Sequence, residues 1–186
     1  MNEQAMADVV SADPWMMAVL REAQQLHLPD WMIGSGFLRN KVWDHLHHIK
    51  REGADTKDID LVYFDSTNVS EQSDENLSAQ MNGNLGLQWE IINQAYTHLW
   101  HDHSQYSSTA EGLSHWVETA TAVAVTLRDG EPVIVAPHGI FDLVTLIVRP
   151  TPSRADDLTL FYERIEQKQW LTKWPKLQVV TTGFHS

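Results

Sequence analysis

The chain has no cysteine, few basic residues and no long apolar run, and each shortage excludes a class of protein. Without cysteine it can form no disulfide, zinc ribbon or thiol nucleophile. Its longest apolar stretches, such as ATAVAVTL, are far shorter than the roughly 20 residues that a membrane-spanning helix needs. The opening residues MNEQAMADVV lack the basic region and apolar run of a secretory signal. We therefore expect a cytoplasmic protein without a membrane partner.

Positive charge is also scarce, which limits the partners that the chain can bind. Lysine and arginine total 13 against 25 aspartate and glutamate residues, giving a net charge of −12. Such a surface repels the phosphates of a nucleic acid, and no basic cluster is longer than Lys50-Arg51. A small phosphorylated ligand remains possible, because a bound cation can neutralise charge locally.

What the sequence does contain is typical of an ordinary globular protein. Its 186 residues are 42% hydrophobic and 20% charged, enough for one domain spanning residues 1–186. Helix-like and strand-like segments alternate irregularly along the chain, without an internal repeat. This order predicts the α+β class, with a mixed β-sheet flanked by helices.

The expected elements follow from apolar spacing and turn residues. Asp13 and Pro14 predict a helix start, and the helix pattern continues to about residue 28. Asp129-Gly130 predicts the turn of a hairpin between strands 119–127 and 131–136. The other expected strands are 31–33, 58–65 and 87–92, and the other helices are 36–49, 93–100 and 155–171, with a short helix inside the polar segment 66–86. The apolar segment 139–148 is either helical or extended, and we favour a helix. We expect residues 101–118 to be irregular.

The strand DIDLVYFD carries the first candidate for chemistry. Asp58 and Asp60 are two residues apart, so both side chains project from the same face of the strand. The rest of the strand is apolar on both faces, which indicates a central position in the sheet. Carboxylates in such a place are costly unless they are paired or bind a cation, and Mg²⁺ prefers oxygen ligands of this kind. Two solvated aspartates at a strand end are the alternative.

A Gly-Ser-Gly turn precedes this strand and opens a helix-like segment. Ser35 is the expected cap of that helix, whose free amides and positive dipole end could hold phosphate groups. Gly34 and Gly36 would let a phosphate chain approach the backbone closely. Arg39 and Asn40, one turn further along, could add contacts to phosphate oxygens, or could instead pair with nearby carboxylates.

Glu90 interrupts the apolar strand LQWEII and is the third candidate carboxylate. A charge at this position suggests that a cation faces it, although an edge glutamate or an ion pair with arginine would fit the same spacing. Asn93 follows directly and could bind a substrate or cap the next helix, and capping is the simpler interpretation.

The ten histidines suggest a metal site less strongly. His98 and His101 lie three residues apart on an expected helix, a spacing compatible with zinc. No glutamate follows in a metalloprotease pattern, and histidine-rich surface helices are common. We therefore interpret these histidines as surface residues.

These motifs in order carry a resemblance to a known family. Gly34-Ser35 followed by Asp58-Ile59-Asp60 and then a third carboxylate strand resembles the polymerase-beta-type nucleotidyltransferase superfamily. More narrowly, the chain resembles a family of small bacterial nucleotidyltransferase-like proteins across residues 15–176. The blocks that carry this resemblance are GSGFLRNKVWD, DIDLVYFD, WEIINQAYTHLW, ETATAVAV, HGIFDL and KWP. The chain departs from the superfamily pattern in a longer spacer, residues 36–57, and in a glutamate where aspartate is more usual.

The resemblance implies a nucleotidyltransferase (polymerase-beta-like) fold and a metal-dependent enzyme. Asp58, Asp60 and Glu90 would be catalytic and would bind Mg²⁺ or Mn²⁺. The nucleoside triphosphate would contact a set of six residues: Gly34, Ser35, Gly36, Arg39, Asn40 and Asn93. Transfer of a nucleoside monophosphate to an acceptor hydroxyl would release pyrophosphate.

The acceptor and the activity itself are less constrained by the sequence. From the acidic charge we expect the acceptor to be a small molecule or a protein rather than a nucleic acid. Two other functions fit the same residues: a catalytically silent nucleotide- or partner-binding module, and a metal-dependent phosphohydrolase that uses water as the nucleophile.

Overall fold

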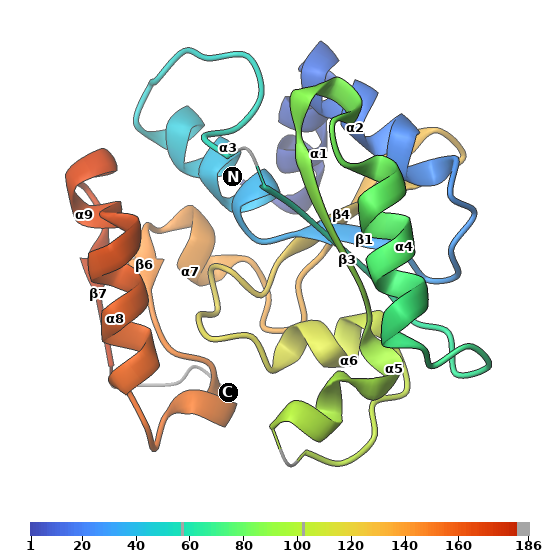
Figure 1. Cartoon of the computed structure of the whole chain (residues 1–186). Helices are drawn as coiled ribbons and strands as arrows, with labels where there is room; N and C mark the ends of the chain where they lie inside the picture. The colour runs from blue at the N-terminus through green and yellow to red at the C-terminus, as the bar shows by residue number, and fades with distance from the viewer. Residues whose placement is uncertain (57, 102, 182–186) are drawn as a thin grey trace.

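A computed structural model describes residues 1–56, 58–101 and 103–181 (Figure 1). Five strands form a mixed sheet in the order β3-β2-β1-β4-β5: β1 (Met32–Gly34), β2 (Asp58–Tyr63), β3 (Gln88–Asn93), β4 (Ala124–Arg128) and β5 (Glu131–Val135). β2 and β3 run parallel, whereas β1 pairs antiparallel with β2 and β4, and β4 with β5. The α+β class and the mixed sheet are therefore confirmed.

Four helices pack apolar residues into the core on one side of this sheet: α1 (Glu3–Ser11), α2 (Pro14–Gln24), α3 (Gly36–Leu46) and α4 (Glu71–Met81). As predicted, Asp13 caps α2 by accepting hydrogen bonds from the amides of Trp15 and Met16. α1 was not predicted, although Met6 and Val10 are fully buried at helical spacing and Asn2 caps the helix start. The alternation in β2 places Ile59 and Leu61 in this core and turns Asp58 and Asp60 to the opposite face.

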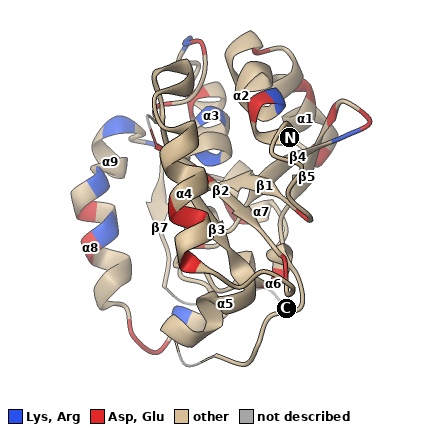
Figure 2. Cartoon of the chain, turned by 45° about the vertical axis from the view of Figure 1, so that its right-hand side comes forward, with Lys and Arg blue, Asp and Glu red and all other residues tan. Residues whose placement is uncertain are grey.

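The opposite face is covered less completely, by short elements and by the C-terminal part of the chain. The short elements are α5 (Gln94–Thr97), a 3₁₀ turn η2 (His98–Trp100) and α6 (Thr109–Ser114). α8 (Thr159–Lys168) and α9 (Trp170–Lys173) stand to one side of the sheet (Figure 1). Figure 2 shows that α8 and α9 carry several of the lysine and arginine residues of this acidic chain.

Three expectations for the remaining segments were inaccurate. Residues 101–118, expected to be irregular, contain α6. The segment expected as one helix, 139–148, divides into α7 (Phe141–Val144) and β6 (Ile147–Val148), because Leu146 adopts a φ of 63° and β6 pairs with β7 (Gln178–Val179). The closing helix is interrupted at Gln169, whose φ of 53° separates α8 from α9.

The other connections are short 3₁₀ turns, η1 (Asn84–Gly86) and η3 (Pro152–Arg154). The hairpin with its Asp129-Gly130 turn is confirmed, since β4 and β5 pair through Arg128 and Glu131. Within the described residues, no helix combines the length and the apolar character needed to cross a membrane.

Candidate functional site

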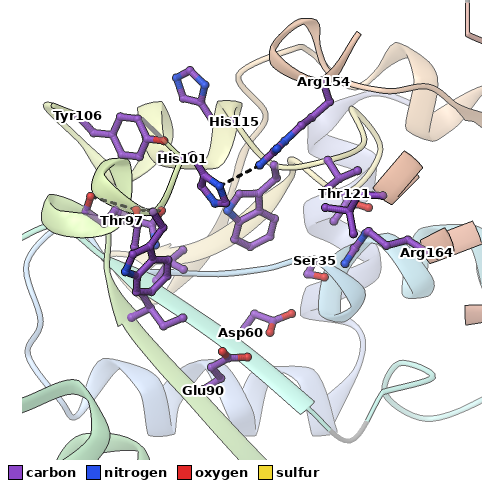
Figure 3. A pocket seen from close by; sticks show the side chains of 18 residues that line it. Ser35, Asp60, Glu90, Thr97, His101, Tyr106, His115, Thr121, Arg154 and Arg164 are labelled. Atoms are coloured by element: carbon purple, nitrogen blue, oxygen red, sulfur yellow. Dashed lines mark hydrogen bonds between the residues drawn. The ribbon is translucent and has the colours of Figure 1, made fainter. Parts of the chain in front are cut away.

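Asp60 and Glu90 lie side by side on two neighbouring strands. In the parallel pairing of β2 with β3, Asp60 is the register partner of Glu90, and Asp58 is the partner of Gln88. Partners in a parallel ladder direct their side chains to the same face, so the carboxylates of Asp60 and Glu90 adjoin (Figure 3). The alternation inferred from the sequence therefore brings residues 58, 60 and 90 to one face of the sheet.

The electrostatic environment disfavours negative charge on this pair. Burial, followed by the nearby charges of Asp60 and Asp58, raises the pKa of Glu90. Burial likewise raises the pKa of Asp60, although a hydrogen bond from Ser35 and the charge of Arg39 act in the opposite direction. Within the described part of the chain, neither carboxylate forms an ion pair with a basic side chain. Added positive charge would therefore be favourable here.

Ser35 sits beside this pair in a strained turn. Its φ of 56° and ψ of −130° belong to a backbone region that favours glycine, and such strain is often found at functional sites. The expected capping role is not observed, because the Ser35 side chain accepts no hydrogen bond from the first turn of α3. The Ser35 side chain instead hydrogen-bonds Asp60. The first-turn amides of α3 thus remain available for an anionic group.

A cavity of about 810 Å³ opens between the carboxylates, the start of α3 and the C-terminal helices. Asp58, Asp60 and Glu90 line it together with Gly36 and the basic side chains of Arg39, Arg164, Lys168 and Lys173. A space with carboxylates at one wall and four cations at another suits a polyanion that is bound through a divalent cation. We call it the cationic cavity.

Arg39 is held rigidly at the wall of the cationic cavity. Its guanidinium lies over the rings of Trp170, 4.4 Å from the centroid, and Trp43, at 5.1 Å. It donates hydrogen bonds to Asn40 Oδ1 (3.0 Å) and Thr121 Oγ1 (2.7 Å). Burial lowers its pKa to about 10, so it keeps its charge at neutral pH. Asn40 in turn donates to the carbonyl of Asp55, which ties that residue to α3.

A second cavity, of about 400 Å³, adjoins the first at these carboxylates. Ser35, Asp60, Glu90 and Arg164 line both spaces, whereas Asp58 lines only the cationic cavity. The remaining wall is rich in rings: Trp100, His101, Tyr106, His115 and Trp116. Figure 3 shows His101 and Arg154 across this space from Asp60 and Glu90. We call it the aromatic cavity.

Most of these additional lining residues were missed in the sequence. Arg164 and Lys168 are four residues apart on α8 and so share one helix face, a signal that was available. The five rings come from η2, the segment 101–108 and the end of α6, where no periodic pattern indicates a common surface. Arg164 also forms an ion pair with Glu118, which is completely buried, and its Nε lies 2.7 Å from Glu118 Oε1.

Two predicted nucleotide contacts have a structural role instead. Asn93 is fully buried: its Oδ1 accepts from the amides of Asp65 and Ala95, and its Nδ2 donates to the carbonyls of Asp65 and Asn68. Gly34 lines neither cavity, and a Cβ there would lie 2.6 Å from a ring carbon of Trp116. Gly34 is therefore needed for the packing of Trp116. We retain Ser35, Gly36, Arg39 and Asn40 as candidates.

The expected metal site fits these residues only in part. Among the described residues, no three His, Asp or Glu side chains form a group that could hold a cation by themselves, so Asp58, Asp60 and Glu90 are not a preformed cage. Magnesium, however, commonly binds through one or two carboxylates and completes its shell with water and substrate phosphates. The adjoining, unpaired carboxylates of Asp60 and Glu90 fit that second arrangement.

Comparison with known proteins identifies the fold. A solution NMR structure that reveals a CCA-adding enzyme head domain is 29% identical, with a TM-score of 0.84 and 97% of each chain covered. A CCA-adding enzyme in complex with CTP and the Thermotoga maritima CCA-adding enzyme in complex with tRNA are both 18% identical, with TM-scores of 0.58. These two structural matches cover 97% of this chain but only 43% and 42% of the chains of those enzymes.

Among curated proteins, none matches the chain. A family model described as Nucleotidyltransferase matches residues 21–179, which include both cavities and all three candidate carboxylates. The fold is therefore that of a nucleotidyltransferase head domain, and the chain belongs to this nucleotidyltransferase family.

Proposed function

We propose that this protein is a metal-dependent nucleotidyltransferase that transfers a nucleoside monophosphate from a nucleoside triphosphate to an acceptor hydroxyl and releases pyrophosphate. The observation that carries the proposal is the position of the Asp60–Glu90 pair, which lines both the cationic and the aromatic cavity. A reacting phosphorus held at this pair would have space for a leaving group on one side and for a nucleophile on the other.

The side chains of the cationic cavity would bind the triphosphate. Ser35 and the free amides of α3 would hold phosphate oxygens at the helix start. Arg39 offers a fixed planar cation, and Lys168 and Lys173 offer two ammonium groups, of which that of Lys173 also pairs with Asp55. These charges would stabilise the pyrophosphate as it leaves, the kind of electrostatic contribution that dominates such reactions.

Asp60 and Glu90 would hold Mg²⁺ or Mn²⁺, with Asp58 adding a third carboxylate on the side of the triphosphate. A divalent cation supplies Lewis-acid polarisation of the phosphate and lowers the pKa of the attacking hydroxyl. The two side chains themselves fix the position of the reaction centre, because the ladder between β2 and β3 determines their spacing.

The solved relatives support the triphosphate as donor, since one CCA-adding enzyme is in complex with CTP and another with ATP. They do not identify the acceptor of this chain, which spans less than half of those enzymes. One such enzyme is in complex with tRNA. The net charge of −12 nevertheless leads us to propose a small molecule or a protein as acceptor rather than a nucleic acid.

Turnover with each nucleoside triphosphate tests this proposal. The protein is incubated with Mg²⁺ or Mn²⁺, one labelled triphosphate and a pool of small-molecule extract, and pyrophosphate and labelled product are measured. We expect metal-dependent pyrophosphate release that Asp58→Ala combined with Asp60→Ala abolishes. Asp8→Asn, a change at an exposed carboxylate of α1, serves as the matched control and should retain the activity.

The products distinguish this function from its two alternatives. Release of orthophosphate from the triphosphate, without labelled product, would identify a phosphohydrolase. Tight triphosphate binding without any turnover would identify a binding module. Circular dichroism of the double variant checks that a loss of activity does not reflect unfolding.

A further inference from the structure

The aromatic cavity has features that the binding of a triphosphate does not require. Its lining includes the tryptophans Trp100 and Trp116, and Tyr106 and His115, whose rings are stacked at 5.0 Å with 12° between their planes. His103 adds a further ring, 4.3 Å from His115. Trp100 is 52% exposed at the rim, beside Leu160 from α8. Such a wall favours a flat ring over a flexible chain.

The geometry of phosphoryl transfer assigns a role to this space. The attacking and leaving oxygens lie roughly in line on opposite sides of the reacting phosphorus. If the pyrophosphate leaves into the cationic cavity, the nucleophile must approach from the other side of the Asp60–Glu90 pair. Both carboxylates also line the aromatic cavity, whereas Gly36, Arg39 and Lys168 line only the cationic cavity, so the aromatic cavity extends from the pair away from the phosphate-binding side chains.

Arg154 gives the cavity one strong anchor for an anion. Its guanidinium contacts His101 Nδ1 at 3.3 Å, and its buried Nε has no hydrogen-bond partner within the described chain. It belongs to none of the ion pairs that these residues form. Buried donors without partners are rare in native proteins, and a ligand oxygen would satisfy this one.

Arg154 is the main positive charge beside His101 and His115 in the aromatic cavity, because both histidines have lowered pKa values. Burial, together with His103, lowers the pKa of His115, and burial with Arg154 lowers the pKa of His101. Both rings are then neutral at pH 7 and can act as hydrogen-bonding, stacking surfaces. His115 Nδ1 is a second buried atom without a partner among the described residues.

We propose that the aromatic cavity binds the acceptor, and that the acceptor is a small molecule with a planar aromatic or heterocyclic ring, a hydroxyl group and one anionic group. The ring lies against Trp100 and Trp116, the anionic group contacts Arg154, and the hydroxyl points toward Asp60 and Glu90. This inference rests on the proposed function, because it takes the opposite cavity as the site of the triphosphate.

The dimensions favour a small molecule over a polymer. A volume of about 400 Å³ is within the range of pockets for single small ligands. Basic side chains line the two cavities, whereas the chain as a whole is strongly acidic, so a long polyanion would gain little outside the cavities.

Calorimetry of the full chain tests the assignment. The protein is first saturated with Mg²⁺ and a non-hydrolysable triphosphate analogue, and adenosine monophosphate is then titrated as a probe that has a ring, hydroxyls and an anionic group. Adenosine lacks only the anion, and ribose 5-phosphate lacks only the ring. We expect adenosine monophosphate to bind about ten-fold more tightly than either of them, given the usual contribution of one stacked ring or one charge-assisted contact.

Two variants separate the contributions. Arg154→Gln should weaken the binding of adenosine monophosphate about ten-fold and leave the binding of adenosine unchanged. Trp100→Ala should weaken the binding of both and leave the binding of ribose 5-phosphate unchanged. Neither should alter the affinity for the triphosphate analogue. Arg21→Gln and Phe141→Ala change an exposed arginine and an exposed aromatic ring outside both cavities, and they are the matched controls.

Each contrary result has a distinct meaning. If the variants weaken the binding of the triphosphate analogue as much as that of adenosine monophosphate, the cavity holds the base of the donor triphosphate, and the inference is wrong. If a short RNA oligonucleotide binds ten-fold more tightly than adenosine monophosphate, a small acceptor is wrong. Binding of the analogue without any binding of the three probes rejects the inference alone. Failure of the analogue to bind rejects the proposed function as well.

Discussion

Asp60 on β2 and Glu90 on β3 are register partners in a parallel ladder, and the backbone pairing of the two strands keeps their carboxylates adjacent. Burial and the charge of Asp60 raise the pKa of Glu90, and the structure retains both carboxylates without an ion-pair partner among the residues it describes. A protein that keeps such an unfavourable pair sacrifices stability, which is characteristic of a functional site.

Removing one of these charges should therefore affect activity and stability in opposite directions. We expect Glu90→Gln and Asp60→Asn to reduce nucleotidyl transfer about a hundred-fold or more, because a cation ligand is lost. We expect the same changes to raise the melting temperature of the metal-free protein at pH 8, because the pKa of each carboxyl is raised in the folded state. Melting curves with and without Mg²⁺ measure this, and a lower melting temperature would show that the pair stabilises the fold.

Arg39 provides a test of the cationic cavity. Arg39→Lys keeps the charge but loses the stacking on Trp170 and the hydrogen bond to Thr121. We expect the dissociation constant for a triphosphate analogue to rise about ten-fold, and the stability to fall by about 1–2 kcal/mol from the lost cation–π contact. Calorimetry and urea denaturation measure the two effects, with Arg21→Lys as the control. Unchanged triphosphate affinity would leave Arg39 a purely structural role.

The buried ion pair between Glu118 and Arg164 should respond asymmetrically to mutation. Glu118 is 0% exposed and Arg164 27% exposed. Arg164→Ala leaves the Glu118 carboxylate buried without its partner and should lower the free energy of unfolding by about 3–5 kcal/mol. Glu118→Gln leaves an arginine that can reach solvent, and it should lower the free energy of unfolding by less. Urea denaturation of both variants measures the difference. Equal costs would mean that Arg164 contributes through packing rather than through its charge.

Asp13 is expected to make stability depend on pH in the acidic range. Burial raises the pKa of Asp13, but the hydrogen bonds from Lys41 and from the amides of Met16 and Gly53 outweigh it, and the net pKa is lowered. A carboxyl whose pKa is lowered by folding stabilises the protein above its unfolded value, near pH 4, and this stabilisation is lost as the pH falls through the folded value.

Asp13→Asn retains a cap for α2 but removes the charge that faces Lys41. We expect it to be about 1–2 kcal/mol less stable than the wild type at neutral pH, with the gap closing below about pH 4. Denaturation at several pH values follows this gap, and the exposed Asp8→Asn is the control. A constant gap at all pH values would indicate that geometry, rather than charge, accounts for the loss.

The parts of the site that were predictable depend on short-range patterns. Alternation along a strand suffices to place Asp58 and Asp60 on one face, and the interruption of an apolar run marks Glu90. The Gly-Ser turn before a helix was equally visible. The sheet class followed from the order of the elements, and the hairpin from Asp129-Gly130.

The remaining parts depend on contacts that no local pattern encodes. Trp100, His115 and Arg154 approach one another only through the packing of η2, α6 and the segment after β6. The role of Gly34 becomes evident only when the ring of Trp116 occupies the space beside it. The position of Asn93 in the sequence fits both a ligand contact and a helix cap, and the four hydrogen bonds of its buried side chain favour the structural role.

The most direct test of the account is Mn²⁺ binding by calorimetry, in the presence of a non-hydrolysable triphosphate analogue, to the wild type and to Asp60→Asn. In the proposed function, Asp60 and Glu90 would rely on substrate phosphates to complete the coordination shell. We therefore predict that Mn²⁺ binds the wild type tightly only when the analogue is present, and that Asp60→Asn abolishes this coupled binding. Undiminished coupled binding by Asp60→Asn would contradict the proposal that these carboxylates hold the metal.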